Sequence, residues 1–210
     1  MALIRAAEKA HTGGSKFHGF CEARIVEFVD RLKEDRAKYP WADVYIDVVI
    51  QTKGSDYTKK IQVSGSFDKD PQGKVSADSK LLKRIYWLFD AMNCTAGVNA
   101  DGMWEDEKGA EITDIESFLN DGYGEGISTG DQYKYYVYVY KEPDKKDPSK
   151  SWNRVHNKIT VNDIKGKEDL EGYINFLKTK GYLKEAELNG VANNNSGTDY
   201  ISADDIPTRL

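Results

Sequence analysis

The sequence predicts a mainly β protein with some α-helix: a five-stranded antiparallel β-barrel with one helix between strands three and four, followed by a C-terminal helix and a flexible tail. Three observations lead to this fold class. First, apolar and polar residues alternate in five segments. Second, after the third of these segments comes one in which apolar residues recur every three or four residues, the spacing of a helix. Third, 210 residues are enough to form one core. A β-sandwich with a capping helix is the alternative for the same order of elements.

The first three predicted strands comprise residues 20–31, 40–54 and 57–67, with a turn at 53–56 between the last two. Successive side chains of a strand point to opposite faces. One face of these strands is therefore apolar and is expected to lie in the core: Cys21, Ala23, Ile25, Val44, Ile46, Val48, Ile50, Ile61 and Val63. Polar residues and Tyr45 alternate with them on the opposite face.

The helix between strands three and four is predicted at 76–94. Its apolar residues recur at helical spacing and define one buried face: Leu81, Leu82, Ile85, Leu88, Phe89 and Met92. Ser76 or Asp78 is expected as its N-cap. This helix is followed by a short helical piece at 113–119 and by strands at 131–143 and 152–163. The last predicted element is an amphipathic helix at 166–186, with Leu170, Ile174 and Leu177 on one side.

These elements predict a peripheral segment at 1–19, one domain at 20–186 and a flexible Asn/Ser/Gly-rich tail at 187–210. No window approaches the roughly 18 apolar residues of a membrane helix. Glu8 and Lys9 stand where an export signal would be apolar. Two free thiols, Cys21 and Cys94, are expected in a reducing compartment, so the sequence favours the cytoplasm, which would be the host cytoplasm for a viral protein.

Charge is unevenly distributed along the chain. The net charge of −5 argues against a simple basic nucleic-acid binder. Residues 101–125, however, carry nine acidic residues against Lys108 alone, so the rest of the chain is about +3. A basic surface outside this acidic block is therefore compatible with the composition.

The segment 131–143 contains five tyrosines, and four of them, Tyr135, Tyr136, Tyr138 and Tyr140, are closely spaced at its centre. If it is a strand, Tyr135, Val137 and Val139 share one face. A hairpin with 152–163 that places Tyr140 opposite Trp152 would put Val155 and Ile159 in the core together with Val137 and Val139. The opposite face, called the tyrosine face below, would then comprise Lys134, Tyr136, Tyr138, Tyr140, Trp152, Arg154, His156 and Lys158.

Alternating rings and cations on one surface are typical of single-stranded nucleic-acid binding, because bases stack on rings and phosphates pair with cations. The tyrosine face is therefore predicted to bind single-stranded DNA, and four residues around the turn between strands two and three extend the predicted groove: Lys53, Tyr57, Lys59 and Lys60. The alternative is that the tyrosines are half-buried under a helix or loop, since tyrosine is also a good strand former.

The order of strands and helix suits the OB type of barrel. After the segment NNNSG, the residues Asp204, Asp205, Ile206 and Pro207 are similar to the acidic tip of bacterial single-stranded-DNA-binding proteins. The chain thus resembles a phage-encoded single-stranded-DNA-binding protein of the OB-fold type, in layout over residues 20–165 and in the tail. The resemblance implies roles in DNA replication and recombination, and a tail that recruits proteins of these processes. Here Thr-Arg-Leu follows the motif, and Leu210 stands where those proteins end in Phe.

The function expected from the sequence is thus non-enzymatic binding of single-stranded DNA, without cofactor and without membrane attachment. The alternative is a β-domain of a virion or surface component that binds carbohydrate or protein, because exposed rings also stack on sugars. A weaker option is a metal-dependent nuclease using Asp101, Glu105, Asp106 and Glu107. The histidines and cysteines lack the close paired spacing of a zinc site, and no catalytic motif is found.

Overall fold

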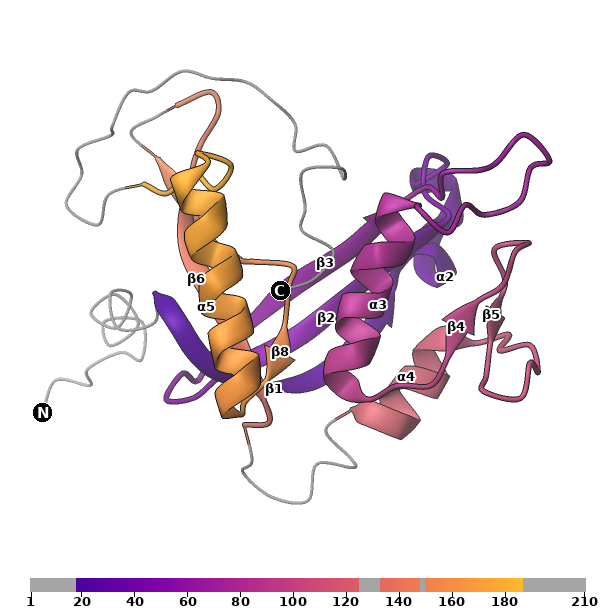
Figure 1. Cartoon of the computed structure of the whole chain (residues 1–210), viewed down its shortest axis with the longest axis horizontal. Helices are drawn as coiled ribbons and strands as arrows, with labels where there is room; N and C mark the ends of the chain where they lie inside the picture. The colour runs from indigo at the N-terminus through magenta and orange to yellow at the C-terminus, as the bar shows by residue number, and fades with distance from the viewer. Residues whose placement is uncertain (1–17, 125–132, 148–149, 187–210) are drawn as a thin grey trace, which may run out of the picture.

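A computed structural model of the chain describes residues 18–124, 133–147 and 150–186 (Figure 1). Its strands are β1 (Gly19–Asp30), β2 (Val44–Thr52), β3 (Thr58–Gly65), β4 (Gly97–Val98), β5 (Trp104–Glu105), β6 (Tyr135–Pro143), β7 (Ser151–Val155) and β8 (Thr160–Val161). Its helices are α2 (Arg31–Asp35), the 3₁₀ turn η1 (Arg36–Lys38), α3 (Lys80–Met92), α4 (Ile115–Tyr123) and α5 (Ile164–Thr179).

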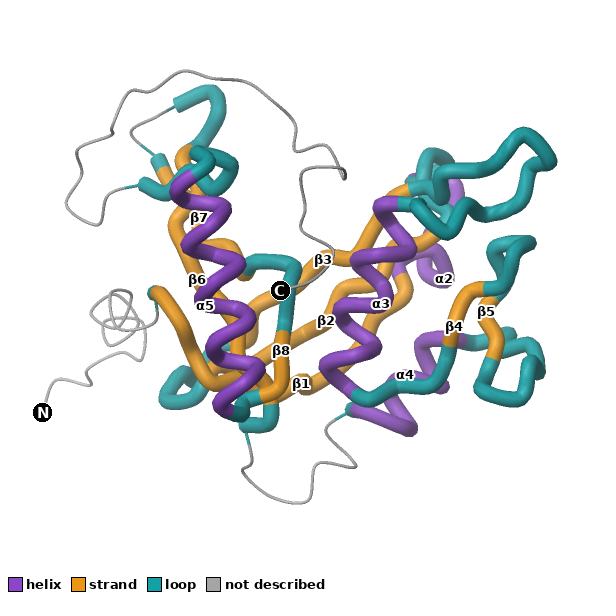
Figure 2. Tube along the Cα trace, in the orientation of Figure 1, coloured by secondary structure: helices purple, strands orange, loops and turns teal. Residues whose placement is uncertain are grey.

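The main sheet is antiparallel throughout, with the strand order β3-β2-β1-β6-β7 and with β8 paired to β6 (Figure 2). The long strand β1 pairs with β6 through its first half and with β2 from Ala23 onward. A bulge between Ile25 and Glu27 interrupts the register with β2, and bulges of this kind increase the local bend and twist of a strand. The predicted mainly β fold with helices is therefore confirmed.

A closed barrel is not formed by hydrogen bonds. The two outer strands, β3 and β7, come close to one another, yet the described residues contain no ladder between them. The sheet is thus strongly curled, with two edges that approach without pairing. The main sheet has six strands, the short β8 included, and is not a closed barrel, so the predicted five-stranded barrel is not confirmed.

The predicted fifth strand at 152–163 is two strands. Five residue steps separate Val155 from Thr160, whereas three separate their partners Val139 and Tyr136 on β6. The two additional residues cannot be accommodated in a regular ladder, so the chain leaves the sheet after Val155 and returns at Thr160. The prediction of one continuous strand was wrong for this reason.

The main core lies between the inner face of the sheet and α3. All six apolar residues predicted for the buried face of α3 are buried, as are Val137, Val139, Val155 and Ile159. The N-cap prediction was wrong: α3 begins after Ser79, whose hydroxyl accepts a hydrogen bond from the Asp68 N–H, while the Asp68 carboxylate accepts one from Lys80 N–H. The N-cap is thus three residues after the predicted Ser76 and one residue after the predicted Asp78.

Helix α4 is attached to the free edge of β1. The Asn120 amide accepts a hydrogen bond from Phe28 N–H at 2.9 Å and donates one to Phe28 C=O at 2.8 Å. The Glu116 carboxylate accepts another from Asp30 N–H. These side chains complete the backbone hydrogen bonding of a strand segment that lies beyond its pairing with β6.

Helix α5 packs on the face of β6 that carries Tyr138, whereas Val137 and Val139 on the other face of this strand lie in the core with α3. Figure 1 shows α5 in front of β6. The predicted apolar side of this helix is confirmed, since Leu170, Ile174 and Leu177 are buried, together with Tyr173. They form a second apolar cluster with Phe20 of β1, the tyrosines of β6 and Trp87 of α3. None of the helices within the described residues is both long and apolar enough to span a bilayer.

Candidate nucleic-acid interface

The hairpin of β6 and β7 forms as predicted, but its register is shifted by two residues. Tyr140 pairs with Arg154 and Glu142 with Trp152, whereas Tyr140 was expected opposite Trp152. His156 N–H donates to Tyr138 C=O at 2.8 Å, which continues the same register. Because the shift is even, Trp152 and Arg154 of β7 keep their predicted face of the sheet.

The tyrosine face is nevertheless not presented to solvent at its centre, because α5 lies on it. Tyr138 is only 5% exposed and contacts the apolar cluster of Leu170, Tyr173, Ile174 and Leu177. Tyr136 and Tyr140 are half-buried beside the same cluster. The prediction that these rings form an open surface was therefore wrong, and the alternative of burial under a helix holds for Tyr138.

The polar tips of these tyrosines bond to α5 and the residues after it. Tyr138 OH donates to Glu185 at 2.6 Å and Tyr136 OH donates to Glu171 at 3.0 Å. Burial and the hydrogen bond to Glu171 raise the pKa of Tyr136 to about 12, and the pKa of Tyr138 is raised by the same two kinds of cause. Both phenols are therefore neutral donors near pH 7.

Cations do lie over these rings, but they come from the same chain. The Lys178 ammonium is 4.6 Å from the centroid of Tyr138, and Lys167 is 5.3 Å from that of Tyr136. Such contacts stabilise a cation over the negative face of a ring. The ring and cation pattern that suggested a ligand is thus largely completed inside the molecule.

His156 and Lys158 belong to this internal arrangement as well. The Lys158 side chain, 13% exposed, pairs with Asp169 of α5 at 2.9 Å and lies 4.7 Å from the centroid of Tyr173. His156 packs against Tyr173, with ring centroids 5.6 Å apart. Burial, with a smaller contribution from the Lys158 charge, lowers the pKa of His156 to about 4. The prediction that His156 and Lys158 are exposed was wrong, and His156 is neutral near pH 7.

Three residues of the tyrosine face remain accessible. Trp152 is 53% exposed and its indole N–H donates to Asp144 at 2.9 Å. Arg154 is exposed and pairs with Glu142 at 2.9 Å. Lys134 is exposed just before β6, where it lines a pocket together with Lys53. The face is thus divided into a covered centre and separate exposed ends.

The four residues predicted to extend the groove around the β2–β3 turn do not all lie on one surface. Tyr57 is 59% exposed, and Lys53 is exposed and paired with Glu22 at 2.6 Å. Lys60 points outward from β3 and pairs with Asp47 at 3.1 Å. Lys59 has the parity of the core residues Ile61 and Val63, and it is half-buried at the end of the strand. Only Lys60 therefore belongs to the outer face of β2 and β3.

Sequence reasoning missed an aromatic cluster on that outer face. The rings of Tyr39, Trp41 and Tyr45 are mutually in contact, with centroid separations of 4.6 Å, 5.9 Å and 6.4 Å. Trp41 is 54% exposed, and the Lys38 ammonium lies 5.5 Å from the Tyr39 centroid. The outward parity of Tyr45 was visible in the sequence, but nothing in it showed that the connection from β1 brings Trp41 and Tyr39 back onto this strand.

Cations lie next to this cluster around one carboxylate. Asp47 is 7% exposed and accepts hydrogen bonds from Arg31 at 2.8 Å and Lys60 at 3.1 Å. Arg31 also pairs with Glu34 at 2.6 Å, so these two cations face two carboxylates, and Lys38 is the further cation beside the rings. We call this surface the outer strip; it comprises Arg31, Lys38, Tyr39, Trp41, Tyr45, Asp47, Lys60 and the exposed Gln62.

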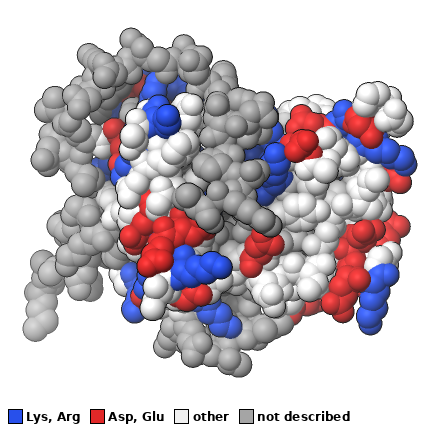
Figure 3. All heavy atoms as spheres, in the orientation of Figure 1, with Lys and Arg blue, Asp and Glu red and all other residues white. Residues whose placement is uncertain are grey.

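The acidic block has a structural explanation in part. Asp106 caps the turn after β5 by accepting hydrogen bonds from Lys108 and Ala110 N–H at 2.8 Å, which lowers the pKa of its carboxyl. Asp101 pairs with Lys74. Acidic side chains gather around β4 and β5 in Figure 3. In the part of the chain that the structure describes, no group of three or more His, Cys, Asp or Glu residues is arranged to hold a metal.

The predicted partner-binding residues Asp204, Asp205, Ile206 and Pro207 lie outside the described residues, as do the tail 187–210 and residues 1–17 of the predicted peripheral segment 1–19. Comparisons with models of known families, with curated proteins and with solved structures returned no match to this chain. Function must therefore be argued from the surfaces themselves.

Proposed function

We propose that this protein is a non-enzymatic binder of single-stranded DNA and that the outer strip is its main contact surface. The observation that carries the proposal is the exposed Trp41, packed on Tyr39 and Tyr45 beside the cations Arg31 and Lys60. A supported ring offers its face to a base, and neighbouring cations pair with phosphates.

The topology supports an OB-type assignment for the fold. The order β6-β1-β2-β3 is that of a Greek key, in which the fourth strand returns beside the first, and β7 extends it. A partly open five-stranded Greek-key barrel is the OB layout, whose second and third strands and first loop bind oligonucleotides. Here these elements are β2, β3 and residues 31–43, which carry the outer strip.

Two further loops add the same residue types. Tyr57 lies at the β2–β3 turn with Lys53, and Trp152 lies at the β6–β7 loop, which also holds the exposed Lys145, Lys146 and Lys150. Three loops thus each present a ring that is more than half exposed together with lysines. The acidic surface around β4 and β5 would repel DNA and so restrict it to the other faces.

The biological role we propose is replication or recombination of DNA in a phage-type system in the cytoplasm, with the C-terminal tail recruiting proteins of these processes. This part rests on the layout and on the tail motif Asp204–Pro207.

The test is fluorescence anisotropy of labelled oligo-dT at two salt concentrations. We expect binding that weakens with salt, with a slope of log K against log salt of about −2 if about three phosphates are neutralised. Trp41→Ala should weaken binding by roughly 5- to 150-fold, the effect of one lost stacking contact of about 1–3 kcal/mol.

The matched control is Tyr86→Ala, which removes a ring 40% exposed on α3, away from the strip. It should leave the affinity unchanged. The proposal fails if no single strand binds at low salt, or if the two variants behave alike.

A further inference from the structure

The outer strip contains a carboxylate, Asp47, among its rings and cations. Asp47 lies on β2 opposite Gln62 of β3, one outward position along the strand from Tyr45. It is only 7% exposed, although the neighbouring Lys60 and Gln62 are exposed. Burial of a charged group is unfavourable unless the group is paired, so the partners of Asp47 decide what it does on this surface.

Both partners of Asp47 are cations that come from other elements. Arg31 of α2 donates to Oδ2 of the carboxylate through Nε at 2.8 Å, and Lys60 of β3 donates to the same oxygen at 3.1 Å. The phosphate oxygens of a nucleic acid accept hydrogen bonds from the same two kinds of donor. Oδ2 of Asp47 therefore occupies, relative to these cations, the position that an oxygen of a bound phosphate would take.

The two cations differ in how firmly they are held. The Arg31 side chain is 24% exposed and pairs with Glu34 as well as with Asp47. The Lys60 side chain is 51% exposed, and it makes no second ion pair in the part of the chain that the structure describes. An ion pair of a half-exposed lysine contributes little stability, and the lysine stem is flexible. Lys60 is thus the cation that can move most easily from Asp47 to a phosphate.

The carboxylate also lies close to the ring cluster of the strip. Burial is the main cause that raises the pKa of the Tyr45 phenol, and the charge of Asp47 is the next largest. Tyr45 in turn contacts Trp41, with ring centroids 5.9 Å apart. A base stacked on Trp41 would therefore bring its backbone phosphates next to the group of Arg31, Asp47 and Lys60.

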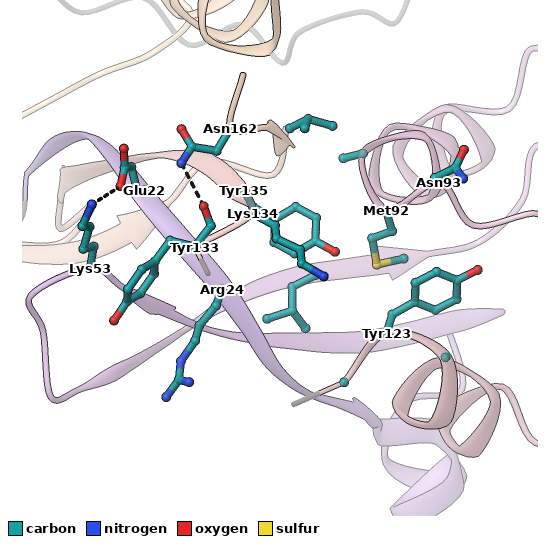
Figure 4. Close-up of a pocket in the computed structure, with 15 residues that line it drawn as sticks. Glu22, Arg24, Lys53, Met92, Asn93, Tyr123, Tyr133, Lys134, Tyr135 and Asn162 are labelled. Atoms are coloured by element: carbon teal, nitrogen blue, oxygen red, sulfur yellow. Dashed lines mark hydrogen bonds and ion pairs between the residues drawn. The ribbon is translucent and has the colours of Figure 1, made fainter. Parts of the chain in front are cut away.

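A second ion pair between these strands lies in a different place. Lys53 at the β2–β3 turn pairs with Glu22 of β1 at 2.6 Å, and Figure 4 shows this pair beside Tyr133 at the edge of a pocket. It shares no residue with the outer strip. Asp47 is thus distinguished by holding two cations next to the exposed Trp41.

We infer that Arg31 and Lys60 form the phosphate subsite of the outer strip and that Asp47 competes with the phosphate of the DNA for them. In the free protein Asp47 holds both cations in place, and on binding Lys60 transfers to the phosphate. Asp47 thereby limits both the affinity of the strip and its dependence on salt. The inference rests on the proposed function, because it assigns a subsite and a control of affinity to the same surface.

The test is fluorescence anisotropy of labelled oligo-dT with Asp47→Asn, which removes the charge and keeps the shape of the side chain. One further cation becomes available, so the slope of log K against log salt should steepen by about 0.7, and binding at about 50 mM salt should tighten roughly 5- to 10-fold. Lys60→Gln added to Asp47→Asn should cancel this gain. Lys60→Gln alone should weaken binding only about two- to threefold, since its charge is already paired.

The control Glu168→Gln removes the same charge from an exposed residue of α5, outside the strip. It should change neither the slope nor the affinity. A second probe is oligo-dT with uncharged methylphosphonate linkages. Asp47→Asn should bind this probe no more tightly than the wild type, whereas Trp41→Ala should still weaken its binding. If Asp47→Asn does not fold, Lys60→Gln tests the subsite, since it should weaken binding of the charged oligonucleotide and leave that of the uncharged one unchanged.

Three outcomes would overturn the inference: no gain in affinity for Asp47→Asn, the same gain for Glu168→Gln, or an equal gain with the uncharged probe. In each of them the wild type still binds oligo-dT, so the proposed function stands. A wild type that binds no oligo-dT would contradict the proposed function and this inference together, so the two failures are distinguishable.

Discussion

The tyrosine face and the outer strip are built alike but end in opposite environments. Both combine strand tyrosines with lysine or arginine on the outward side of a paired strand. In the first, α5 covers the rings, and Tyr138 is 5% exposed. In the second, no helix of the described residues covers the rings, and Trp41 is 54% exposed. Residue types alone therefore do not separate a packing surface from a binding surface.

The difference arises from what each surface must bury. Helix α5 has an apolar side that includes Leu170, Ile174 and Leu177, and this side needs an apolar partner. The inner face of the sheet is already filled by α3. The tyrosine face, enlarged by Phe20 from β1, is the surface that α5 covers.

The largest effect that would test this comparison is loss of a buried ring. Tyr138→Ala should lower the free energy of unfolding by about 3–5 kcal/mol, because it removes a ring from the cluster under α5 and the hydrogen bond that the ring donates to Glu185. Urea denaturation measures this change. A loss below about 1 kcal/mol would mean that α5 does not pack on Tyr138 in solution.

The next effect concerns the carboxylate of the outer strip. Asp47→Ala should cost about 2 kcal/mol, because Arg31 and Lys60 lose their shared partner, which is nearly buried. Glu142→Ala breaks the exposed pair with Arg154 and should cost less than about 1 kcal/mol. Equal costs in denaturation experiments would contradict the assigned difference in burial.

A pH effect of intermediate size should come from beneath α5. The pKa of His156 is about 4 in the folded protein and about 6.5 in an unfolded chain. Between these values the unfolded state binds more protons, so stability falls as pH decreases from about 6.5 to 4, by on the order of 2 kcal/mol. Thermal melts across this range should show a smaller decrease for His156→Gln. An identical decrease in both proteins would show that His156 is not the source.

The smallest stability effect is expected for the exposed ring of the outer strip. Trp41→Ala should change the free energy of unfolding by less than about 1 kcal/mol, since more than half of the side chain is already in water. The same variant is expected to weaken oligo-dT binding. A large loss of stability would instead make the Tyr39–Trp41–Tyr45 cluster a packing feature.

Much of the fold could be predicted because it depends on local periodicity. Alternation identified β1, β2, β3 and β6, and helical spacing identified α3 and α5 with their buried sides. The hairpin register was wrong by two residues, because its loop length does not determine which residues pair. The break after Val155 was missed because alternation in the sequence continues across residues that the ladder cannot include.

The sequence by itself determined which side chains of each strand share a face, because strand geometry alternates regularly. Tyr136, Tyr138 and Tyr140 indeed share theirs, with Val137 and Val139 on the other side. Only the tertiary structure decided which outward face stays open. That choice depends on where α5 finds an apolar partner and on how residues 31–43 return to β2, and both involve contacts between segments far apart in the chain.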